Sequence, residues 1–171
     1  MKNILSVLVE NRAGVLARTA GLFARRGYNI ESLAVGETAD ATASRMTIVV
    51  DGDEAVVGQV QKQLNKQIDV IKVRKLDADG ATRRELALIK VRAVEVSRRA
   101  ITDIAAMMKA DIADLSATTA TVAIADTPER VRQLIELLAP YGIVEMARTG
   151  MVALQKGGAG IGAGIGAGFG A

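Results

Sequence analysis

The fold is decided by the stretch from residue 3 to residue 35, which reads NILSVLVENRAGVLARTAGLFARRGYNIESLAV. Residues 3–9 are a run of Leu and β-branched side chains, which predicts a strand. Apolar side chains then recur at helical spacing until Gly27, a residue typical of helix ends, so residues 15–26 predict an amphipathic helix. Residues 28–35 return to a strand pattern. The stretch therefore predicts a strand, a helix and a second strand.

The rest of the first half extends this order. Residues 45–51 predict a strand, Asp53 is a suitable cap for a following helix, and residues 68–76 predict a closing strand. The order is β-α-β-β-α-β, and it defines a first domain over residues 2–76. Residues 77–83 follow; they begin with the polar sequence DADGAT, which predicts a linker.

The second half repeats the order, over a predicted domain of residues 84–156. Its predicted elements are strands at 85–94, 112–117, 121–125 and 143–154, a helix capped by Ser97, and a helix that begins at Pro128. Two such units of about 70 residues form an internal repeat. The predicted class is α+β, with two tandem ferredoxin-like units, each a four-stranded antiparallel sheet with helices on one face. The faces without helices are expected to be covered by association of units or chains.

The end of the sequence has a different composition. Residues 157–171 read GGAGIGAGIGAGFGA. A Gly-rich run loses much backbone entropy when it orders and has few side chains to bury. A disordered tail is therefore predicted there.

Composition excludes several functions. The chain has 171 residues and contains 0 Cys and 0 His, so disulfides, Cys/His zinc sites and His-based catalytic triads are excluded within it. Only 2% of residues are aromatic, which leaves little to stack on nucleobases. The net charge of +3 is spread among interspersed acidic and basic residues. With no targeting signal and no 18-residue apolar run, a cytoplasmic location is predicted.

The turn between the first strand and the first helix is the most informative stretch for function. It reads Asn11-Arg12-Ala13-Gly14. The first N–H groups of a helix lack partners within the helix and favour an anion, such as the carboxylate of an amino acid. Gly14 allows close approach of a ligand, and the carboxamide of Asn11 can accept from an ammonium group. Asn29, at the start of the second strand, is a further amide. Both asparagines are also explained as ordinary turn residues.

These stretches resemble a known family. Residues 1–76 are similar to the regulatory (small) subunit of acetohydroxyacid synthase, also called acetolactate synthase, in which this unit is an ACT domain. The matching segments are ILSVLVEN at 4–11, GVL at 14–16, GLF at 21–23, RRGYNIESL at 25–33 and SRMTI at 44–48. The second unit fits through ELALIKV at 85–91, PYGI at 140–143 and ARTG at 147–150.

The resemblance implies a non-catalytic subunit that activates a large catalytic subunit and makes it sensitive to branched-chain amino acids, chiefly valine. It implies no cofactor in this chain, with thiamine diphosphate, magnesium and FAD on the large subunit. The effector site implied lies between the ACT domains of two chains. Its residues are Asn11, Arg12, Ala13, Gly14, Val15 and Leu16 from one chain, with Asn29 and Ile30 reaching in from its neighbour.

Three other functions stay open as hypotheses. A free-standing amino-acid sensor that acts on a different partner is the main alternative. An enzyme in its own right is disfavoured. The candidate catalytic carboxylates Glu31, Asp51 and Asp69 are expected to be surface or strand-end charges with no base beside them. RNA binding is disfavoured because strands 3–9 and 45–51 carry no aromatic side chain.

Overall fold

The computed structural model describes residues 2–158 and 160–162, and the chain divides into two units. The first unit holds the described residues up to 82 together with those from 151 onward. The second unit is Arg83–Gly150. Each unit is an antiparallel β-sheet with two helices on one of its faces, as predicted.

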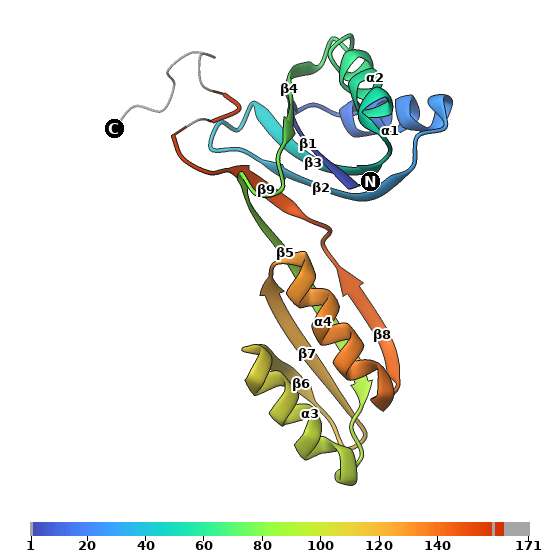
Figure 1. The fold of residues 1–171 in the computed structure, drawn as a ribbon, viewed down its shortest axis with the longest axis vertical. Coiled ribbons are helices and arrows are strands. Elements are labelled where there is room, and N and C mark those ends of the chain that lie inside the picture. The colour runs from blue at the N-terminus through green and yellow to red at the C-terminus, as the bar shows by residue number, and fades with distance from the viewer. Residues whose placement is uncertain (1, 159, 163–171) are drawn as a thin grey trace. The chain divides into compact units, whose positions relative to one another are not determined.

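The first unit has the predicted order of elements. They are β1 (Lys2–Glu10), α1 (Val15–Arg26), β2 (Ile30–Glu37), β3 (Ala43–Asp51), α2 (Glu54–Leu64) and β4 (Val70–Leu76). The strands pair antiparallel in the order β2-β3-β1-β4. Both helices lie on one face of this sheet (Figure 1).

Local sequence signals explain where these elements begin and end. The carboxylate of Asp53 accepts from the backbone N–H of Val56 and so caps α2, as predicted. Gly27 ends α1 with a φ of 68°, a left-handed conformation that glycine adopts without steric cost. The core between the helices and the sheet includes Phe23, which is 1% exposed. Its ring packs edge to face on the ring of Tyr28, with 6.3 Å between the two ring centroids.

The second unit repeats the topology. Its elements are β5 (Ala81–Arg92), α3 (Glu95–Met108), β6 (Asp111–Leu115), β7 (Thr119–Asp126), α4 (Pro128–Leu138), the 3-10 turn η1 (Ala139–Tyr141) and β8 (Ile143–Arg148). The strand order β6-β7-β5-β8 corresponds to that of the first sheet, and α3 and α4 again share one face (Figure 1). The prediction of tandem ferredoxin-like α+β units is confirmed.

Two local predictions are wrong. Ser97 does not cap α3, because the helix begins two residues before it; the cap position is Val94, and the Ser97 hydroxyl donates to the Val94 carbonyl instead. The strand predicted over 143–154 is two strands, β8 and β9 (Val152–Gln155). Gly150 interrupts it with a φ of 77°, which extended backbone cannot hold.

The boundaries between the units also differ from those expected. The predicted linker 77–83 is shorter, since β5 already begins at Ala81, and Ala81 is 5% exposed. Residues 151–156 belong with the first unit and not with the second. The backbone N–H of Lys156 donates to the Gly80 carbonyl, which ties this segment to the β4–β5 turn.

Described residues of the C-terminal segment, 151–158 and 160–162, cover part of the face of the first sheet that has no helices. Ala153 of β9 packs in a cluster with Ile4 and Leu76, and Ile161 packs with Leu8 and Ala43. Ile161, which lies in the stretch 157–171 predicted to be a disordered tail, is only 5% exposed. Residues 159 and 163–171 of the predicted tail lie outside the described residues. In this structure the chain itself covers part of a face that was expected to need a partner.

Candidate functional site

The turn before α1 leaves several backbone donors free. Gly14 occupies the cap position with a φ of 86°, and no side chain of a described residue caps the helix. Among the described residues, no hydrogen bond is made by the backbone N–H of Ala13, Gly14 or Leu16. No acidic side chain lies in the first turn of α1. The helix start therefore has unpaired donors that could face an anion.

Asn11 is held in place by the β2–β3 turn. Its side-chain nitrogen donates to a carboxylate oxygen of Glu37 and to the carbonyl of Ala41, each at 2.9 Å, and its backbone N–H donates to the Thr42 carbonyl at 2.7 Å. Both amide hydrogens are thus used. The side-chain oxygen receives no hydrogen bond within the described part of the chain, so it can accept from an ammonium group.

An ionised carboxylate braces the β2–β3 turn. The Thr42 hydroxyl donates to Asp40 at 2.6 Å and the Thr42 backbone N–H donates to the same oxygen at 2.9 Å. These two bonds, the hydroxyl first, hold the pKa of Asp40 below its ordinary value. Asp40, in the turn that positions Asn11, therefore keeps its charge to a lower pH than an ordinary aspartate does.

A buried carboxylate, Asp69, organises two arginines beside the turn. Asp69 is 4% exposed and accepts from Arg18 at 2.6 Å and from Arg12 at 3.2 Å. Arg12 also pairs with Glu10. A side chain added at Gly14 would begin 2.9 Å from Nη1 of Arg18, which places this guanidinium directly at the helix start. Arg12 is among the residues predicted from the sequence and Arg18 is not, while Asp69, expected to be a surface or strand-end charge, is buried just before β4.

The remaining predicted site residues are not all together. Ala13 and Leu16 are exposed beside Gly14, whereas the side chain of Val15 is 3% exposed and packs in the core. Asn29 and Ile30 lie at the far end of β2. Ile30 is level with Val50 and Asn3, while Glu37, the partner of Asn11, ends the strand eight residues beyond Asn29. That span is about 26 Å at the usual rise of a strand.

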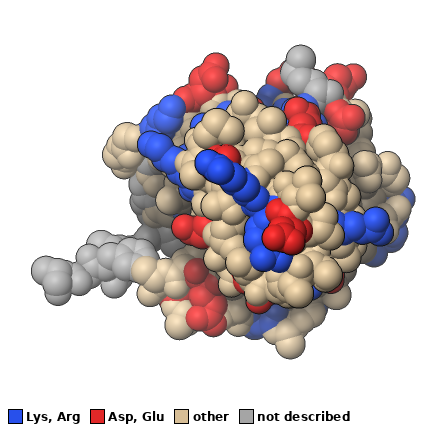
Figure 2. Space-filling view, turned by 90° about the horizontal axis from the view of Figure 1, so that it is seen from below, with Lys and Arg blue, Asp and Glu red and all other residues tan. Residues whose placement is uncertain are grey.

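Other kinds of site find no support in the described residues. They contain no group of three or more acidic side chains that could hold a metal ion. On the face shown in Figure 2, Lys and Arg are interspersed with Asp and Glu, without a block of one sign. None of the described helices is both long and apolar enough to cross a bilayer.

Comparison with known proteins identifies the family. The model of the ACT domain of acetohydroxyacid synthase small subunits matches residues 5–72, and that of the small subunit of acetolactate synthase matches residues 84–157. The chain belongs to the acetolactate synthase small-subunit family. The first unit is thus an ACT domain of this kind, and the second is the unit that accompanies it in the small subunits.

Individual relatives extend over nearly the whole chain. The acetolactate synthase small subunit of Mycolicibacterium smegmatis is 48% identical over 158 residues, covering 92% of this chain and 93% of the relative. That of Bacillus subtilis is 46% identical, with 92% of each chain covered. The crystal structure of the small subunit from Thermotoga maritima superposes with a TM-score of 0.86 at 36% identity, covering 93% of this chain and 99% of that one.

Proposed function

We propose that this small subunit binds the large catalytic subunit of acetolactate synthase, raises its activity, and makes it sensitive to feedback inhibition by valine or another branched-chain amino acid. The observation that carries the proposal is the open start of α1 in a chain of this family. Thiamine diphosphate, magnesium and FAD are assigned to the large subunit, and none to this chain.

The chemistry of the turn suits an amino-acid zwitterion. The free N–H groups of Ala13, Gly14 and Leu16 offer donors to a carboxylate, at the positive end of the helix. The unused oxygen of Asn11 offers an acceptor to the ammonium group. Leu16, which is 46% exposed, offers apolar surface to a branched side chain.

A second copy of the chain would bring Asn29 and Ile30 to the turn before α1, which they do not reach within one chain. β2 is an edge strand of the first sheet, with a free side for pairing. If the β2 strands of two copies pair antiparallel about a twofold axis, the Asn29 end of one strand lies beside the Glu37 end of the other. Asn29 and Ile30 of the second copy then come close to Asn11 of the first. Bound valine would thus bridge two chains.

Such bridging provides a route to regulation. Valine that contacts two chains favours the arrangement of the pair in which both sets of contacts form, and a differential affinity of a few kcal/mol is enough to shift the population. The second units are proposed to carry this shift to the large subunit.

Reconstitution tests the proposal. The chain is mixed with its large subunit, and acetolactate formation is followed while valine is titrated. Higher activity than that of the large subunit alone, with inhibition as valine rises, supports it. Failure of the two proteins to co-purify would favour a sensor that acts on a different partner.

A further inference from the structure

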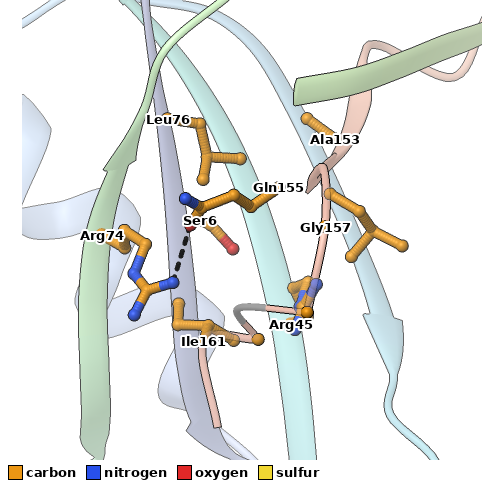
Figure 3. Close-up of a pocket in the computed structure, with 11 residues that line it drawn as sticks. Ser6, Arg45, Arg74, Leu76, Ala153, Gln155, Gly157 and Ile161 are labelled. Atoms are coloured by element: carbon orange, nitrogen blue, oxygen red, sulfur yellow. Dashed lines mark hydrogen bonds between the residues drawn. The ribbon is translucent and has the colours of Figure 1, made fainter. Parts of the chain in front are cut away.

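A second hollow lies in the first unit, on the sheet face opposite α1 and α2. It is a cavity of about 300 Å³ between the sheet and the C-terminal segment. Strands β1, β3 and β4 form its floor, and β9 with Gly157, Gly158, Gly160 and Ile161 forms its other wall (Figure 3). Every lining residue belongs to the first unit.

The register of the sheet brings three polar side chains into this cavity. Ser6 of β1 lies directly opposite Arg74 of β4, and Leu8, two residues along β1, lies opposite Arg45 of β3. Paired residues and residues two apart point to the same face of a sheet. Figure 3 accordingly shows Ser6 between the two arginines.

The described residues do not use up the hydrogen-bonding capacity of these groups. Ser6 is 2% exposed, and its enclosed hydroxyl has no partner among the described residues. Such an unpaired buried group costs stability unless something satisfies it. Arg45 makes no hydrogen bond or ion pair with any described residue, and burial lowers its pKa. Arg74 donates to the side-chain oxygen of Gln155 at 2.7 Å, which leaves other guanidinium donors and the Gln155 amide nitrogen available.

The lining has the charge and the backbone suited to an anion. Among the described residues, the lining contains two guanidinium groups and no carboxylate. Gly158 and Gly160 also line it, and a side chain placed at either would meet no atom of a described residue beyond its chain neighbours within 4 Å, so a ligand can approach their backbone closely.

We propose that this cavity binds a phosphate group, either free or carried by a small organic molecule. A phosphate near neutral pH carries between one and two negative charges and three strongly accepting oxygens, which matches two guanidinium groups, a hydroxyl and an amide nitrogen. A carboxylate has only two oxygens and one charge, so it would leave donors unpaired. The site is separate from the proposed effector turn and does not depend on it.

Isothermal titration of the full chain in a buffer without phosphate tests this site. The probes are inorganic phosphate, glycerol 3-phosphate and acetate. One phosphate per chain is expected, and Arg45→Met or Arg74→Met is expected to weaken its binding about 10- to 100-fold, because each removes a charge-assisted contact. Arg26→Met, which removes an exposed arginine at the end of α1, is the matched control and should bind like the unaltered chain. Tighter binding of either phosphate probe supports the site and indicates its natural source.

The Ser6→Ala variant separates a binding role from a structural one. Loss of an unpaired hydroxyl should leave the thermal unfolding temperature without phosphate unchanged or higher, yet weaken phosphate binding. The proposal is overturned if neither phosphate probe binds, if Arg45→Met binds as tightly as the unaltered chain, or if acetate binds as tightly as phosphate.

Discussion

Replacing Gly14 by Asp should abolish the response to valine while leaving the chain folded. Gly14 has a φ of 86°, so any other residue there is strained by about 1–2 kcal/mol. Its new Cβ would begin 2.9 Å from Nη1 of Arg18, the far end of a flexible side chain that can move aside. The strain therefore lowers the free energy of unfolding without destroying the fold.

The effect on binding comes from the added charge. A carboxylate at position 14 would face the carboxylate of bound valine, and two such charges about 4 Å apart near a protein surface repel by up to about 4 kcal/mol. Arg18 would neutralise part of this. The remaining repulsion of about 2–3 kcal/mol corresponds to roughly 30- to 150-fold weaker binding.

Gly14→Ala is the matched control, because it carries the same backbone strain without the charge. Both variants are reconstituted with the large subunit, and acetolactate formation is measured against valine concentration. Gly14→Ala should keep inhibition at somewhat higher valine, and Gly14→Asp should lose it while still raising the activity of the large subunit. Equal inhibition of the two variants would refute the argument that the carboxylate of valine lies at this turn.

Three further predictions concern stability and pH. Phe23→Ala should lower the free energy of unfolding by about 3–5 kcal/mol, measured by urea denaturation, because it empties a fully buried site in the first core. Arg148→Met should lower the free energy of unfolding by about 1–3 kcal/mol in the same assay, because the arginine donates to both oxygens of Glu85, a carboxylate only 4% exposed. The double variant with Glu85→Leu should recover most of this stability. If it recovers none, the ion pair is not the cause. The affinity for valine, measured by calorimetry, should stay constant from about pH 5.5 to 8.5, because the chain has 0 His and Asp40, whose pKa is lowered, stays ionised throughout this range. A marked change in affinity near pH 6.5 would contradict this.

The sequence predicted most of the fold because local signals determine it. Alternation, helical spacing, the Asp53 cap and Gly27 each act within a few residues, and all are found in the structure. What could not be predicted depends on contacts between distant segments. Ile161 is buried because it meets Leu8 and Ala43, more than 100 positions earlier, and nothing in its glycine-rich surroundings indicates that.

In the candidate site, too, residues set by local signals could be predicted, and residues set by contacts between distant segments could not. Asn11 and Gly14 could be selected because a helix start has orphan N–H groups wherever it occurs. Asp69 pairs with Arg18 across 51 residues of sequence, so no spacing pattern reveals it. Asn29 is a residue that composition and pattern cannot assign to the turn, because within one chain it lies at the opposite end of β2.

Mixing two inactive variants tests the central claim most directly. Gly14→Asp damages the turn of one chain, and Asn29→Asp damages the group proposed to reach in from the neighbour. In a mixed pair both changes fall in one of the two symmetry-related sites, which leaves the other intact. We predict that each variant alone binds valine far more weakly than the unaltered chain by calorimetry, and that mixing them restores one site of unaltered affinity in each mixed pair. If mixing restores no binding although mixed pairs form, the site does not span two chains.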